Sequence, residues 1–400
     1  MKTSVGSGTE SAQLPAGYRA AGLAAGIKAT GHPDMALIVS DRPATAAGVF
    51  TTNQVCAAPV KLDREHLRRG MARAIVVNSG VANACTGTRG LRDARRMAAV
   101  TAGHLGIRAQ EVFVCSTGRI GVYLPMDKVE AGIGQLAAAL SEHGGERAAQ
   151  AIMTTDTRPK RYTVSFHAGR VEARLTGLAK GAGMIEPNMA TMLCFLLTDV
   201  AVERAALQRA LKWAVDRSFN RITVDGDRST NDTVLMLANG AAGGAPLREG
   251  GPGWRAFLTA LEETTDRLAR MIVRDGEGAT RLVTIRVRGA RSDAEAEQAA
   301  RSVANSLLVK TAWAGSDANW GRVMDALGYS PARVEESKVD IAFDGLWAVR
   351  RGAPGPADEA QLRAVVTQPE FTVTIHLHLG QGEATIYTCN LTEEYVRINV

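Results

Sequence analysis

A glycine-rich loop that leads into a threonine and an apolar run is the stretch of this sequence whose residue types best suit covalent chemistry. It extends from Lys180 to Leu193 and reads KGAGMIEPNMATML. Its glycines at 181 and 183 permit positive φ angles, which suit either an ordinary turn or a loop that bends a peptide carbonyl toward an attacking side chain. A threonine hydroxyl acts as a nucleophile when a base lies beside it. Composition alone leaves both interpretations open.

Histidine-based and metal-based chemistry find little support in the sequence. The seven histidines form no catalytic arrangement, and His376 and His378, which share a predicted strand face, lack further ligands. Ser116-Thr117-Gly118 follows the apolar run 112–114 and is, by composition, a polar turn. The same turn could present hydrogen-bond donors to an oxyanion. No metal and no resident cofactor are therefore expected.

Short motifs spread over nearly the whole chain occur together in one known family. Besides the loop at 180–193, they are DRPA (41–44), GVFT (48–51), VNSGVANACTG (77–87), STGRIG (116–121), IMTTDT (152–157), FNRITVDGD (219–227), STNDT (229–233), DGEGAT (275–280) and DANWGR (317–322). In this order they resemble the ornithine acetyltransferase (glutamate N-acetyltransferase) family of self-cleaving enzymes. The resemblance places the cleavage between Ala190 and Thr191.

The resemblance implies a mechanism in which cleavage creates the active site. Cutting the bond frees an α-amino group on Thr191, the same residue that carries the nucleophilic hydroxyl. Because an α-amine titrates at about pH 8, it can accept the hydroxyl proton and return it to a leaving amine. The implied reaction is a ping-pong transfer of acetyl from N2-acetyl-L-ornithine to L-glutamate in arginine biosynthesis. Whether acetyl-CoA also serves as an acetyl donor stays open.

The resemblance also implies roles for residues outside the loop. Thr117 and Gly118 correspond to the oxyanion donors. Lys180 and Glu277 match substrate-binding positions, and the substrates require a cation for the carboxylate and an anion for the ornithine ammonium. By composition alone, both would be solvated loop charges. The implied substrate-binding residues are Thr154, Lys180, Thr191, Glu277 and Asn399.

Two positions depart from the family pattern. Arg119 stands where the family often has an apolar residue. Asn399 is followed only by Val400, without the short tail ending in a hydroxyl residue. One substrate contact near the carboxyl end therefore has no counterpart in this sequence.

The elements that position these residues indicate an α/β fold. Apolar residues between 254 and 274 fall on one helical face, and residues 282–287 alternate as in a half-exposed strand. Residues 371–379 and 384–389 alternate on either side of Gly380-Gln381-Gly382, which predicts a β-hairpin. We expect a large layered α/β domain with mixed sheets over 1–280 and a smaller α+β domain over 281–400.

Composition narrows the class of protein further. The chain has 400 residues, 46% of them hydrophobic and 5% aromatic, and a formal net charge of +6. No apolar run approaches the roughly 20 residues of a membrane-spanning helix, and the N-terminus resembles neither a secretory signal nor a transit peptide. The five cysteines are scattered without a C-x-x-C pair. A cytoplasmic protein with reduced thiols is expected.

Alternative functions remain at this stage. An N-terminal-nucleophile amidase or aminopeptidase would share the architecture but resolve the acyl-enzyme with water. A nucleotide- or nucleic-acid-binding protein would fit the basic charge, but the sequence lacks a P-loop, a dinucleotide-binding fingerprint and aromatic residues for base stacking. The expected partners are small molecules, together with the chain's own fragments 1–190 and 191–400, two of each. No nucleic acid or membrane partner is expected.

Overall fold

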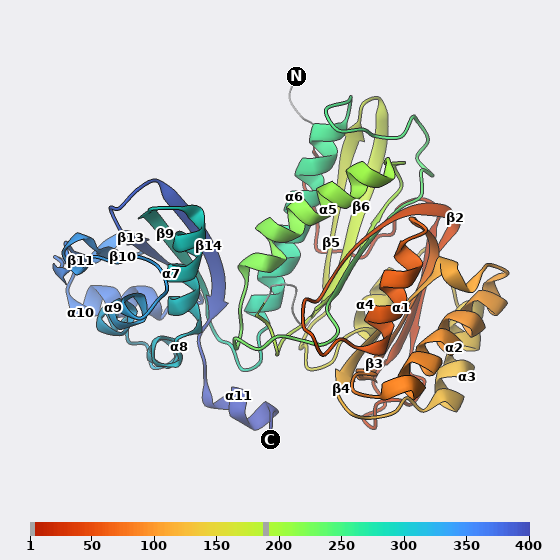
Figure 1. The fold of residues 1–400 in the computed structure, drawn as a ribbon, viewed down its shortest axis with the longest axis horizontal. Coiled ribbons are helices and arrows are strands. Elements are labelled where there is room, and N and C mark those ends of the chain that lie inside the picture. The colour runs from red at the N-terminus through yellow and green to blue at the C-terminus, as the bar shows by residue number, and fades with distance from the viewer. Residues whose placement is uncertain (1–4, 187–191) are drawn as a thin grey trace. The chain divides into compact units, whose positions relative to one another are not determined.

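The computed structural model describes residues 5–186 and 192–400 (Figure 1). Contacts divide the chain into two compact units, the first formed by residues up to 220 with 228–272 and the second by 221–227 with 273–400. The predicted domain boundary after residue 280 falls a few residues beyond the end of the first unit. Each unit contains one sheet covered by helices, so the predicted α/β class with mixed sheets is confirmed.

The first unit is built on an eight-stranded mixed sheet. Its order is β4-β3-β2-β8-β7-β6-β5, and β1 pairs with β2. The β3/β4 and β7/β8 pairs are parallel and the other pairs are antiparallel. The strands are β1 (Tyr18–Leu23), β2 (Met35–Phe50), β3 (Met71–Val81), β4 (Val112–Arg119), β5 (Lys160–Ala168), β6 (Val171–Lys180), β7 (Leu193–Thr198) and β8 (Thr233–Ala238).

Helices cover both faces of this sheet. Along β2, Leu37 and Val39 pack with residues of α2 and α3, whereas Ala36 and Ile38 pack with residues of α4. Because successive strand residues point to opposite faces, the two cores lie on opposite sides of the sheet. The elements are α1 (Ala58–Leu67), α2 (Gly87–Leu105), η1 (Ala109–Glu111), α3 (Met126–Ala138), α4 (Gly145–Ala151), α5 (Arg204–Arg217), η2 (Phe219–Arg221) and α6 (Trp254–Arg274).

The centre of the sheet is apolar on both faces. Every residue of β7 (LCFLLT) and β8 (TVLMLA) is buried. Such continuous apolar runs are typical of strands covered by helices on both sides. The predicted helix over 254–274 is confirmed as α6, which lies so close to β6 that a Cβ on Gly177 would stand 2.5 Å from the Leu268 side chain.

The second unit holds a six-stranded sheet in the order β12-β11-β10-β13-β9-β14. The predicted strand at 282–287 is confirmed within β9. The elements are β9 (Leu282–Ala290), α7 (Asp293–Asn305), α8 (Leu307–Ala314), α9 (Trp320–Gly328), η3 (Glu336–Lys338), β10 (Asp340–Phe343), β11 (Leu346–Arg350), β12 (Ala353–Pro354), α10 (Glu359–Val366), β13 (Glu370–His376), β14 (Gly382–Cys389) and α11 (Glu393–Ile398).

The predicted hairpin near the carboxyl end is wrong. β13 pairs with β9 in parallel and β14 pairs with β9 antiparallel, so β9 lies between them. The connecting segment bonds to the end of β9 instead of closing a turn, since Leu377 N–H donates to the Arg288 carbonyl and Leu379 N–H to the Gly289 carbonyl. Alternation along a strand predicts the strand but not its partner.

Within the described residues, no helix is long and apolar enough to cross a membrane. The five cysteines are free thiols, and Cys115, Cys194 and Cys389 are buried.

Candidate active site

Three of the predicted site residues meet inside the first unit. Lys180, the last residue of β6, donates from Nζ to Thr154 Oγ1 at 2.6 Å and to Thr117 Oγ1 at 3.4 Å. The Lys180 side chain is 3% exposed and Thr117 is buried. Thr117 and Thr154 precede Lys180 by 63 and 26 positions in the sequence. Tertiary folding therefore brings their two hydroxyl groups to the Lys180 ammonium.

A fourth residue, Asp156, organises this cluster. Its Oδ1 accepts from Lys160 Nζ at 2.5 Å and from Gly181 N–H at 2.7 Å, and its Oδ2 accepts from Thr154 N–H at 2.9 Å. Lys180 Nζ lies 3.9 Å from Oδ2. Burial by itself raises the pKa of Asp156, but the two lysines and these hydrogen bonds outweigh it and hold that pKa well below its usual value. Asp156 is therefore a carboxylate.

The charge of the cluster favours an anionic ligand. One carboxylate faces two buried ammonium groups, and Lys160 makes the shorter contact with it. A third lysine, Lys28, donates to the carbonyls of Pro33 and Met153, next to Thr154 in the chain. Burial lowers the pKa of Lys28, and Lys180 lowers it further. Positive charge in excess at a site of low exposure suits recognition of a substrate carboxylate.

The backbone at Thr117 and Gly118 is held by the parallel pairing of β3 with β4. Gly80 lies opposite Gly118 in this pair. Gly118 has φ +129°, and a Cβ at this position would stand 2.2 Å from the Gly80 carbonyl carbon. Only glycine fits such a close approach of two backbones. The polar turn predicted at residues 116–118 is wrong, because these residues are the last part of strand β4 and pair with β3. The catalytic role of Thr117 and Gly118 stays a prediction.

Two asparagines lock neighbouring strand ends around residues 116–118. Asn78 Oδ1 accepts from Ser116 Oγ at 2.6 Å, and Asn231 Nδ2 donates to the carbonyls of Ala82 and Ser116 at 2.6 and 2.8 Å. Both amides are buried, where hydrogen bonds to backbone carbonyls are costly to lose. They join the ends of β3, β4 and the segment entering β8, and so fix the residue that precedes Thr117.

The predicted cleavage site, Ala190 and Thr191, lies outside the described residues. The next residue, Met192, is buried, and its N–H donates to Asp232 Oδ1 at 2.7 Å. Its carbonyl accepts from Thr233 N–H at 3.1 Å. The chain that follows Thr191 is therefore held on both sides of Met192 by the first residues of the β8 segment.

Glu277 and Asn399 belong to the second unit and contact each other there. Asn399 Nδ2 donates to Glu277 Oε2 at 2.7 Å and to the Tyr395 carbonyl at 2.9 Å. Glu277 is 9% exposed, whereas Asn399, at the end of α11, is exposed. The two residues that the resemblance assigns to substrate binding in this unit thus form one hydrogen-bonded pair.

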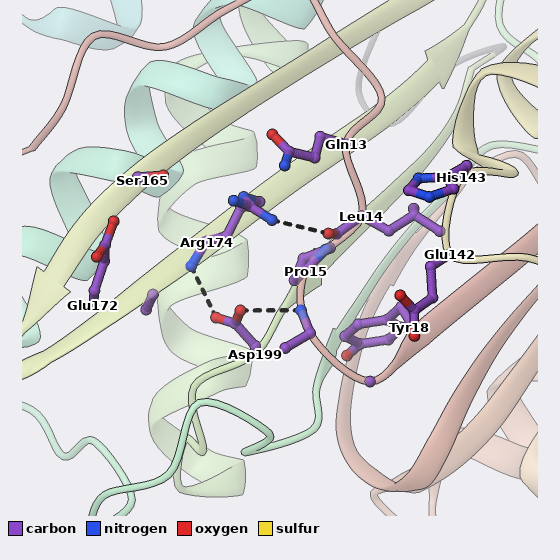
Figure 2. A pocket seen from close by; sticks show the side chains of 13 residues that line it. Gln13, Leu14, Pro15, Tyr18, Glu142, His143, Ser165, Glu172, Arg174 and Asp199 are labelled. Atoms are coloured by element: carbon purple, nitrogen blue, oxygen red, sulfur yellow. Dashed lines mark hydrogen bonds between the residues drawn. The ribbon is translucent and has the colours of Figure 1, made fainter.

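A cavity of about 540 Å³ in the first unit holds none of the predicted site residues (Figure 2). The segment before β1 lines it, along with parts of β5 and β6. Asp199 accepts from Ala16 N–H and Arg174 N–H, and Arg174 Nη1 donates to the Leu14 carbonyl. These hydrogen bonds attach the amino-terminal segment to β6. Of the polar side chains that Figure 2 shows, these hydrogen bonds account for Asp199 and Arg174.

Sequence reasoning missed several residues of this site. Asp156, Asn231 and Asp232 all lie within the motifs at 152–157 and 229–233, but no role was assigned to them. Their membership of these motifs was the available signal. Lys160 lies outside every motif and only its contact with Asp156 identifies it.

The chain is similar to known proteins over nearly its whole length. The model of the ArgJ family matches residues 19–400. Proteins named arginine biosynthesis bifunctional protein ArgJ from Geobacter sulfurreducens and Symbiobacterium thermophilum are 53% and 52% identical to this chain, over 96% of it and 98% and 96% of their own lengths. The crystal structure of the arginine biosynthesis bifunctional protein argJ from Bacillus halodurans is 41% identical with a TM-score of 0.50, and covers 51% of this chain and 97% of that chain.

Proposed function

This chain belongs to the ArgJ family, and from that membership we propose that it is a self-processing acetyltransferase carrying acetyl from N2-acetyl-L-ornithine to L-glutamate on Thr191. It is an acyltransferase of arginine biosynthesis. The observation that supports the finer proposal is that the hydroxyls of Thr117, a predicted oxyanion donor, and Thr154, a predicted substrate-binding residue, meet at the buried ammonium of Lys180. Such a centre suits the carboxylate and the acyl group of an N-acetylated amino acid.

The proposed processing step converts an internal threonine into an N-terminal one. The Thr191 hydroxyl oxygen bonds to the Ala190 carbonyl carbon, the Ala190–Thr191 C–N bond breaks, and the nitrogen takes up the hydroxyl proton. Water then hydrolyses the resulting ester, which leaves a carboxylate on Ala190 and a free α-amine on Thr191. The Bacillus halodurans chain supports a cut near the middle, because it is matched over nearly its whole length yet covers only half of this chain.

In the transfer cycle, the freed amine accepts the proton of the Thr191 hydroxyl as its oxygen attacks the acetyl carbonyl. Negative charge develops on the carbonyl oxygen, and Thr117 and Gly118 are proposed to stabilise it. Ornithine leaves with the proton. The amine of glutamate then attacks the acetyl ester, N-acetylglutamate departs, and the threonine hydroxyl is restored.

The remaining assignments complete the proposal. From the resemblance, Thr154, Lys180, Glu277 and Asn399 are proposed to bind the substrate, with Lys180 as the cation for its carboxylate and Glu277 as the anion for the ornithine ammonium. The protein needs no resident cofactor, and acetyl-CoA is a candidate second donor. A cytoplasmic location and an assembly of two 1–190 and two 191–400 fragments belong to the same proposal.

One experiment tests both the processing and the chemistry. Denaturing electrophoresis of the purified protein should show two pieces of nearly equal length, and Thr191→Ala should leave one intact, inactive chain. The matched control is Thr259→Ala, since Thr259 is exposed on α6 and its variant should be cut and active.

Turnover of N-acetylornithine is then measured with and without glutamate. A transferase requires glutamate, whereas an amidase of the same architecture would release acetate at an equal rate without it. An intact wild-type chain with full activity would exclude Thr191 as the nucleophile.

A further inference from the structure

Lys28 lies in the loop between β1 and β2, and one buried carboxylate shapes this loop. Asp34 Oδ1 accepts from Ala25 N–H at 2.6 Å. Its Oδ2 accepts from Ile27 N–H at 2.6 Å and from Lys28 N–H at 2.9 Å. The Asp34 carbonyl accepts from Ser79 N–H at 2.8 Å, near the end of β3. Because three backbone N–H groups share one buried carboxylate, the backbone of Lys28 is fixed against the end of β3.

The Lys28 side chain lies at the strand ends that carry the predicted oxyanion donors. A Cβ on Gly80 would stand 3.1 Å from Lys28 Cγ, so the aliphatic stem of the lysine passes close to the backbone of Gly80. Gly80 lies opposite Gly118 in the β3/β4 pair. Lys28 therefore reaches the same end of the sheet as Thr117 and Gly118.

The Lys28 ammonium group keeps one hydrogen for a ligand. Its Nζ donates to the carbonyls of Pro33 and Met153 at 2.8 and 2.7 Å. An ammonium group has three donors, and Lys28 has no third acceptor among residues 5–186 and 192–400. The side chain is half-buried, so a ligand can still reach it. A partly desolvated donor of positive charge favours an anionic acceptor.

The charges around Lys28 point to the same kind of ligand. Burial lowers the pKa of Lys28, Asp34 and Asp156 raise it in part, and Lys180 lowers it. Lys28 holds the Met153 carbonyl and Lys180 holds the Thr154 hydroxyl, so two ammonium groups bind neighbouring residues of one segment. An anion beside both would relieve their repulsion and raise the pKa of Lys28 again.

We propose that Lys28 is a second cation for the substrate carboxylate and donates its remaining hydrogen to one oxygen of that group, beside Lys180. This inference rests on the proposed function. A carboxylate has two oxygens and can accept from two cations at once. N2-acetyl-L-ornithine and glutamate both carry an α-carboxylate next to the reacting nitrogen. One site for this group therefore serves both halves of the transfer.

The test combines a change in the enzyme with a change in the substrate. Lys28→Met removes the ammonium group, and N2-acetyl-L-ornithinamide has an uncharged amide in place of the carboxylate. Lys28→Met should lower kcat/KM for N2-acetyl-L-ornithine about tenfold, mostly through KM, because a charged hydrogen bond is lost. For the amide, kcat/KM should fall by less than about twofold. A merely structural role would lower both values by the same factor.

Lys128→Met is the matched control, because Lys128 holds the same loop from the exposed surface of α3. Its Nζ donates to the Gly26 carbonyl at 2.7 Å. This variant should keep the wild-type kcat/KM for both substrates. A second measurement needs no variant: reductive methylation of the wild-type lysines is followed by mass spectrometry with and without ornithine. Bound ornithine should protect Lys28 and leave Lys128 reactive.

Two results would overturn the inference. One is a Lys28→Met enzyme whose kcat/KM changes by the same factor for the acid and the amide, or for neither. The other is methylation of Lys28 at the same rate with and without ornithine. If the wild type transfers acetyl from N2-acetyl-L-ornithine to glutamate while either result is found, only this inference fails. If the wild type shows no such transfer, the proposed function fails first.

Discussion

Asp156 and Asp232 are both buried in the first unit, and their surroundings give them opposite tendencies to ionise. Asp156 accepts two backbone N–H groups and the Lys160 ammonium, with Lys180 nearby, so its pKa is lowered. Asp232 accepts from Met192 N–H, with the charge of Lys180 and the hydroxyls of Ser229 and Thr51 nearby, but burial outweighs these groups and its pKa is raised. Neighbouring cations, and not depth of burial, decide which buried acid is charged.

The two regions therefore serve different steps. The region around Asp156 holds Lys180 and Thr154, which are proposed to bind a substrate anion. The region around Asp232 holds Met192, the residue that follows the proposed nucleophile.

The largest effect is expected on stability, from a substitution in the region around Asp156. Asp156→Asn removes the carboxylate that two buried lysines share, which should lower the free energy of unfolding by about 3–5 kcal/mol. Urea unfolding of the uncut Thr191→Ala chain with and without this change measures it. Asp127→Asn in the same background serves as the control. Equal midpoints for Asp156→Asn and the control would show that the lysines do not depend on Asp156.

A smaller effect separates binding from stability within that region. Lys180→Met should reduce kcat/KM for N-acetylornithine by roughly 100-fold, mostly through KM, because a charged hydrogen bond to the substrate carboxylate is lost. Lys160→Met removes the closer partner of Asp156. We expect it to lower the melting temperature more than Lys180→Met does and to raise KM less. Steady-state kinetics give KM and thermal unfolding gives the melting temperature of both variants. A larger rise in KM for Lys160→Met than for Lys180→Met would reverse the assignment.

The smallest effect is the opposite pH dependence of the two acids, measured in the uncut chain. Because the pKa of Asp156 is lower folded than unfolded, its contribution to stability is complete above about pH 4 and is lost as the pH falls further. The pKa of Asp232 is higher in the folded than in the unfolded chain. Its contribution to stability is therefore complete below about pH 4 and is lost as the pH rises.

Asp232→Asn should therefore stabilise the uncut chain by about 1 kcal/mol at pH 7, and this gain should vanish near pH 4. Unfolding midpoints in buffers across this range provide the measurement. A gain that persists at low pH would mean that charge is not its cause.

Much of the fold could be predicted from local patterns. The helix at 254–274 and the strand at 282–287 followed from periodic apolar residues, because the side that faces a core is recorded in the spacing. The hairpin at 371–389 could not be predicted correctly. Its strands take β9 as a common partner, and β9 lies some eighty residues earlier in the chain.

The candidate site, like the fold, could be predicted only in part from the sequence. The sequence by itself determined the motifs, and their resemblance to a known family predicted the cleavage site and the residue types for acyl transfer. Only the tertiary structure decided that Asp156 is a charged group beside Lys180 and that Asp232 accepts a hydrogen bond from Met192 N–H. The physical reason is that a pKa or a hydrogen bond depends on groups within a few ångströms, and folding brings those groups from distant parts of the chain.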